Sequence, residues 1–157
     1  YPLPEAQLDR FMFNINVDYP SFEEEVDIVK NTTGDRDDKP SSVLTADEIR
    51  AIQQLIRRVP VADNVVEYAV SIASRTRPGS PRANDMVNKY LSWGAGPRAS
   101  QNLVLGAKAH AVIHGKFSPD AEDVRAVAKP ILRHRIVKNY MADAEGITEE
   151  KIIESLF

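Results

Sequence analysis

Residues 94–100 read GAGPRAS, a short pattern whose residue types could bind a phosphate group. Proline favours the first helical position and glycine the position before it, so Gly96 and Pro97 predict a helix that starts with Arg98 in its first turn. The free N–H groups and the positive dipole end of a helix start attract anions. A guanidinium adds a fork of donors that stays charged. From the spacing alone, Arg98 also fits a surface arginine that pairs with an acid.

Arg10 is a second candidate, at the end of the opening stretch YPLPEAQLDRF. Pro4 suits the first turn of a short helix over residues 5–9. The following residues 11–17, FMFNINV, alternate an aromatic and β-branched face with a second face that holds two asparagines, which predicts a strand. Arg10 therefore lies at a junction from which its side chain could project outward, although Asp9 beside it could also pair with it.

Two further groups of residues have less specific patterns. His110 and His114 lie one turn apart on a predicted helix, a spacing that can present two imidazoles to one metal ion. No cysteine and no adjacent carboxylate pattern accompanies them, so we interpret them as helix-surface histidines and predict no metal site. The basic stretch of residues 133–135, with Lys138 nearby, is interpreted as the charged end of a helix. An interface with a nucleotide or a neighbouring domain is the alternative.

The elements that position these residues are mainly helical. A capped helix is expected over residues 21–31, and a capping box at Thr45 and Glu48 starts another. Apolar spacing predicts helices over 63–74 and 97–114, a further one after residue 120, and a last one capped by Thr148, while residues 89–94 suit a short extended piece. The fold class is thus mainly α, a helical bundle preceded by a short helix and one strand. Residues 31–42, NTTGDRDDKPSS, have the composition of a linker.

Composition limits the functional classes. The chain has 157 residues, 20 basic against 23 acidic side chains, and a net charge of −3. A generic binder of nucleic acid usually has a basic excess, so nucleic acid is disfavoured as a partner. No apolar run approaches the roughly 20 residues of a membrane helix, so we expect no membrane segment. The absence of cysteine excludes disulfides and is compatible with the cytoplasm, where we place the protein.

Two long blocks resemble one known family. YPLPEAQLDRF, the predicted strand and YPSFEEEVDIV resemble the segment that ends the nucleotide-binding core of MoxR-family AAA+ ATPases. GAGPRAS, its alanine-rich helix and FSPDAEDVRAVAKPILRHRI resemble the helical lid of that family. The resemblance implies a division into a C-terminal remnant of the core (1–18), a connecting helix and linker (19–40) and a lid domain (41–157).

The resemblance also implies roles for the candidate residues. Arg10 matches the arginine finger, which reaches into the neighbouring subunit's site in trans, and Arg98, with Gly96 and Pro97, matches the sensor 2 arginine at the nucleotide of its own subunit. ATP and Mg²⁺ would be the cofactors of the parent protein, whose partners are the other subunits of a homo-oligomeric ring and a client protein that it remodels or activates. No Walker A or acidic Walker B motif occurs in these 157 residues. We therefore expect this piece alone neither to bind a cofactor nor to hydrolyse ATP.

Two other interpretations remain open at this point. A stand-alone helical interaction module would have no nucleotide role, and Arg10 and Arg98 would then be replaceable. A DNA-binding helical domain would need a basic recognition helix, which the acidic balance disfavours. A lone strand needs neighbours to satisfy its backbone and to cover its apolar face. We therefore expect residues 11–17, if the rest of their sheet is missing, either to fold back on the lid or to pair with a second copy.

Overall fold

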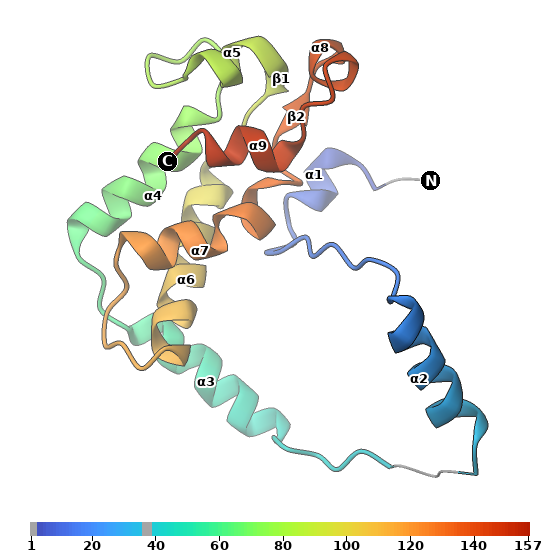
Figure 1. Cartoon of the computed structure of the whole chain (residues 1–157). Helices are drawn as coiled ribbons and strands as arrows, with labels where there is room; N and C mark the ends of the chain where they lie inside the picture. The colour runs from blue at the N-terminus through green and yellow to red at the C-terminus, as the bar shows by residue number, and fades with distance from the viewer. Residues whose placement is uncertain (1–2, 36–38) are drawn as a thin grey trace.

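The computed structural model describes residues 3–35 and 39–157, and it is mainly helical, as predicted (Figure 1). The described residues form two short strands and nine helices, and most of the helices carry the start signals that the sequence shows. The elements are, in order, α1 (Glu5–Leu8), α2 (Phe22–Thr33), α3 (Ala46–Arg58), α4 (Asp63–Arg75), α5 (Asp85–Tyr90), β1 (Leu91–Trp93), α6 (Pro97–Ile113), α7 (Ala121–Leu132), β2 (Val137–Lys138), α8 (Tyr140–Ala144) and α9 (Glu149–Glu154).

The core forms where α6 packs against α4 and α7. Small side chains on the buried face of α6 let the helices approach closely, and a Cβ added at Gly106 would lie only 3.2 Å from side-chain atoms of Val127 and Ile131. The largest fully buried side chains include Leu103 of α6 and Ile131 of α7. Because interiors this dense resist local shifts, the first turn of α6, which carries Arg98, has a fixed position.

A strand pair brings the residues before α6 beside the residues after α7. β1 and β2 are antiparallel, with Leu91 opposite Lys138 and Trp93 opposite Val137. The extended piece expected over residues 89–94 therefore exists, although its first two residues belong to α5. The pairing brings the segment before GAGPRAS beside the segment that follows the basic stretch 133–135.

The strand predicted over residues 11–17 is wrong. Among the described residues no strand lies beside this segment, and its backbone bonds go to the C-terminal end of α7 instead. The Asn14 N–H donates to the Pro130 carbonyl at 2.8 Å, and Arg133 donates to the Asn14 carbonyl at 3.1 Å. The segment thus folds back on the lid, one of the two outcomes that we expected. Its apolar side chains remain uncovered, with Ile15 74% and Val17 90% exposed.

Helix α2 stands apart from this core, whereas the end of α3 lies against α6 (Figure 1). Each begins with a capping box, Ser21 with Glu24 and Thr45 with Glu48, and neither contains a buried residue. Local capping rather than packing therefore accounts for where they start. Residues 36–38 of the predicted linker lie outside the described residues. In the part of the chain that the structure describes, no helix has the length and apolar character that crossing a membrane requires.

Candidate functional site: an arginine-lined groove

Arg98 lies where the sequence places it, in the first turn of α6. Gly96 is the N-cap and Pro97 the first helical residue. The preceding turn is held by the buried Thr76, whose hydroxyl accepts the Ala95 N–H at 2.8 Å and donates to the Ala73 carbonyl at 2.6 Å. Hydrogen bonds from a core residue thus fix the loop that leads into α6.

Gly94 is required at this turn, and we expect its replacement to be costly. A Cβ on residue 94 would lie 2.3 Å from the carbonyl oxygen of Thr76, so Gly94→Ala must displace backbone. The expected loss is about 2 kcal/mol or more of unfolding free energy, measured by urea denaturation. Gly96→Ala is the matched control, because a Cβ there meets no atom within 4 Å. Equal stability of the two variants would contradict this interpretation.

Asp9 joins Arg98 to a second arginine. One carboxylate oxygen, Oδ2, lies 2.8 Å from Arg98 Nη1, and the other, Oδ1, lies 3.0 Å from Arg135 Nε. Asp9 therefore pairs with these distant arginines and not with its neighbour Arg10. The Arg98 side chain is 46% exposed, so its ion pair with Asp9 contributes little stability and can be exchanged for another anion.

Arg135 holds the segment that carries Arg10. Its side chain is only 1% exposed. Besides Asp9 Oδ1, it donates to the backbone carbonyls of Asp9 at 2.8 Å, Phe11 at 2.5 Å, Met12 at 3.3 Å and Ile131. Burial lowers the pKa of the Arg135 guanidinium, and the bond to Asp9 opposes that shift. One buried side chain thus fixes the turn on either side of Arg10.

The other basic residues of this region are also engaged inside the protein. Arg133 Nε lies 3.1 Å from Glu150, and Lys138 lies 3.2 Å from Asp143. The imidazole of His134 bonds to the Phe11 carbonyl at 3.0 Å, and burial lowers its pKa. The stretch 133–135 is therefore an internal docking surface for residues 9–14. The interpretation as a plain charged helix end is therefore wrong, and the structure favours the alternative of an interface, although its particular contacts could not be predicted because the partners lie far apart in the chain.

Arg10 and Arg98, separated by 88 positions in sequence, line one groove of about 690 Å³, together with Arg57 from the last turn of α3. None of the lining residues is acidic. Among the described residues, Arg10 and Arg57 make no ion pair and their guanidinium groups no hydrogen bond, and both side chains are exposed. Three guanidinium groups on one groove suit a ligand with several negative charges. The remaining lining residues are Val66, Val70, Ser100, Gln101, Asn102, Val104 and Leu105.

Sequence reasoning found two of these three arginines and missed Arg57. Its helix has a clear capping box, but nothing in the local pattern of α3 separates Arg57 from the exposed Arg50 and Arg58 on the same helix.

Comparisons with known proteins agree on one family. Residues 83–156 match the family model described as "AAA lid domain". The chain is 35% identical over 153 residues to "Chaperone MoxR1" of Mycobacterium tuberculosis, covering 98% of this chain and 40% of that protein. It is 31% identical to the uncharacterized protein YeaC of Bacillus subtilis, covering 99% of this chain and 46% of that protein.

A solved structure gives the same answer. The crystal structure of a protein of Cytophaga hutchinsonii, provisionally named as an ATPase, matches with a TM-score of 0.90 and 32% identity over 99% of this chain and 48% of that one. The chain belongs to the MoxR-type AAA+ proteins. It spans less than half the length of the relatives that it matches, and it carries the AAA+ lid.

The histidine pair of this MoxR-type lid has a different environment from the groove. The Nδ1 atom of His110 lies 2.7 Å from the buried carboxylate of Asp123, and the Nδ1 of His114 lies 2.8 Å from the His110 carbonyl. The centroids of the two rings lie 4.1 Å apart, and the ring planes are tilted by 30°. Within the described residues no group of three or more histidine or acidic side chains is placed to hold a metal ion.

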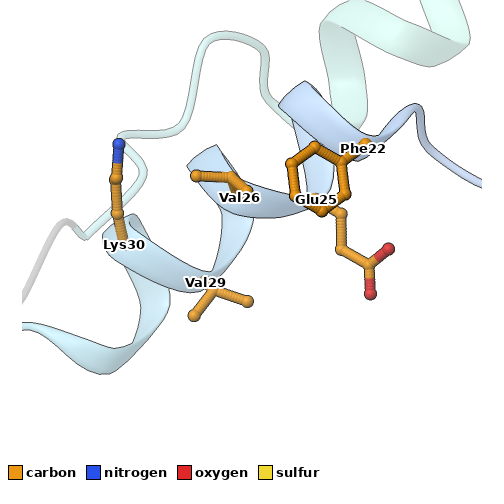
Figure 2. A pocket seen from close by; sticks show the side chains of 5 residues that line it. All are labelled: Phe22, Glu25, Val26, Val29 and Lys30. Carbon is orange, nitrogen blue, oxygen red and sulfur yellow. The ribbon is translucent and has the colours of Figure 1, made fainter.

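A second hollow, of about 360 Å³, lies on α2 of the MoxR-type chain (Figure 2). Phe22, Val26 and Val29 form its apolar part, and Glu25 and Lys30 carry opposite charges beside them. All five side chains come from one helix (Figure 2). Its lining holds one acidic and one basic side chain, so this hollow lacks the excess of positive charge by which the arginine-lined groove could bind an anion.

Proposed function

We propose that this chain is the lid-bearing part of a MoxR-type AAA+ ATPase, and that its arginine-lined groove receives the terminal phosphates of ATP held by a nucleotide-binding core. The observation that carries the proposal is the convergence of Arg10 and Arg98 on one groove without a lining acid. ATP and Mg²⁺ are the cofactors of the complete protein. Mg²⁺ would be held by the core and by the phosphates, as in other P-loop NTPases.

Arg10 acts as the arginine finger. Negative charge on the transferring phosphoryl group is spread over its equatorial oxygens, and a positioned guanidinium stabilises it without any covalent step. Arg10 suits this role because its side chain has no competing partner among the described residues, while Arg135 fixes the backbone on either side of it. The backbone from which the Arg10 side chain projects is thus fixed before ATP arrives, so less ordering remains for the binding step.

Arg98 acts as the sensor arginine at the same phosphates. Its bond to Asp9 occupies one terminal nitrogen, Nη1, so other donors of the guanidinium remain for a phosphate oxygen. Gly96 and Pro97 set the helix start, whose free N–H groups and positive dipole end add to the attraction for an anion.

The shared groove favours a different assignment of the subunit whose ATP Arg98 contacts. The family resemblance assigns Arg98 to the nucleotide of its own subunit and Arg10 to that of the neighbour. Two side chains that line one groove reach one phosphate site more easily than two different ones. We therefore propose that one subunit delivers both arginines to its neighbour's ATP, in a homo-oligomeric ring in the cytoplasm that acts on a client protein.

Mixed rings test this arrangement in the full-length protein. Arg10→Ala, Arg98→Ala and the double variant are each assayed for ATP turnover. Two pairs are then co-expressed: Arg10→Ala with Arg98→Ala, and the double variant with a variant whose Walker A lysine is replaced. If one subunit delivers both arginines, only the second pair regains activity, because only there does a working core meet two intact arginines.

The other outcomes are equally distinct. Recovery in the first pair alone means that Arg98 serves its own subunit. Wild-type turnover by both single variants contradicts the nucleotide role as a whole and supports the helical interaction module instead.

A further inference from the structure

Arg57 contributes to the groove from an element that neither candidate motif includes. It lies in the last turn of α3. The ammonium group of Lys108 on α6 donates to the Arg57 carbonyl at 3.2 Å, which ties the end of α3 to the helix that carries Arg98. The Arg57 guanidinium is left on the groove without an ion pair in the described part of the chain. By contrast, Arg50 on the same helix pairs with Asp47 at 3.1 Å.

Arg98 is paired with Asp9, whereas Arg10 and Arg57 have no such partner in the described part of the chain, so the groove keeps an excess of positive charge that an anion would offset. The overall composition does not impose this arrangement, because the chain has a net charge of −3. The groove also has apolar lining from Val66 and Val70 on α4. Val70 and all three arginines are themselves exposed, so it is the excess of positive charge and not burial that suits this groove to a polyvalent anion.

We propose that Arg57 is a third phosphate-binding residue, and that it makes the site prefer a nucleoside triphosphate over a diphosphate. This inference rests on the proposed function. ATP carries one more phosphoryl group and more negative charge than ADP, and three guanidinium groups match that charge better than two. Binding through Arg57 also engages α3 directly with the bound nucleotide.

The test uses the full-length protein with Arg57→Ala, Arg57→Lys and Arg58→Ala, and measures the KM for ATP and the inhibition constant for ADP. Arg58 is the matched control, because it is the next residue on the same helix, is exposed and does not line the groove. Loss of a hydrogen bond to a charged group typically corresponds to about tenfold or more in affinity. We expect Arg57→Ala to raise the KM for ATP by about that factor and the ADP constant by less, with Arg57→Lys between it and wild type.

Two results separate failure of this inference from failure of the proposed function. If Arg57→Ala matches Arg58→Ala while Arg10→Ala and Arg98→Ala are inactive, the role of Arg57 is overturned and the proposed function stands. If Arg10→Ala and Arg98→Ala retain wild-type turnover, the proposed function fails, and with it the basis for Arg57. Because Arg57 is exposed, its variants should fold normally, and equal melting temperatures would verify this.

Discussion

Replacing Arg10 by alanine in the full-length protein is expected to lower kcat for ATP hydrolysis by about 10³-fold or more. An arginine finger typically accounts for a factor of this size, because it acts on charge that develops only in the transition state. The KM for ATP should change far less than kcat for the same reason. Steady-state kinetics of the assembled protein measures both constants.

Two variants serve as comparisons for Arg10→Ala. Arg10→Lys keeps the charge but loses the planar fork, so most of the activity should still be lost. Arg50→Ala removes an exposed arginine paired with Asp47 on α3, away from the groove, and should leave kcat unchanged. A kcat for Arg10→Ala within tenfold of wild type would be incompatible with an arginine finger.

Replacing Arg135 by methionine is the second change with a large expected effect. Removing one partner of a buried ion pair commonly costs about 3–5 kcal/mol, and here the carbonyls of residues 9, 11 and 12 also lose their donor. Asp9 is itself 32% exposed, so we expect a loss near the lower end, about 3 kcal/mol. Urea denaturation measures it.

The same substitution should also reduce ATP turnover although Arg10 and Arg98 are both intact. The turn that holds Arg10 would lose its anchor, and Asp9 would lose one of its two arginines. Arg125→Met is a suitable control, because Arg125 bonds to Tyr68 at the surface, away from residues 9–12. Wild-type stability and turnover of Arg135→Met would show that the segment is held by other contacts.

Sequence reasoning succeeded where local rules decide the structure. The cap at the start of the helix over residues 21–31, the capping box at Thr45 and the Gly96-Pro97 pair located three helix starts. Sequence reasoning failed where the local structure depends on partners that are distant in the sequence. The alternation of residues 11–17 satisfies the pattern of a strand, but a strand needs a second strand beside it. These residues instead contact the end of α7, through one backbone hydrogen bond and through side chains. The two residues of β2 are too few to show any periodicity.

The candidate site shows the same division between local features, which the sequence reveals, and long-range contacts, which it does not. Arg98 has a local signal, and Arg10 has a family signal. The convergence of both with Arg57 depends on how α1, α3 and α6 meet, which no window of sequence contains. The role of Arg135 was hidden for the same reason, since its main partner Asp9 lies 126 positions away.

That separation has a consequence for the order in which the chain folds. The most extensive contacts within the bundle, of α6 with α7 and of α4 with α6, join elements that lie close together in the sequence, whereas the Asp9–Arg135 bond closes a loop that spans most of the chain. Long loops carry a larger entropic cost, so local contacts form first and distant ones later. The bundle should therefore assemble as the nucleus, and residues 9–14 should dock onto α7 last. Arg10 would reach its working position only after the lid had folded.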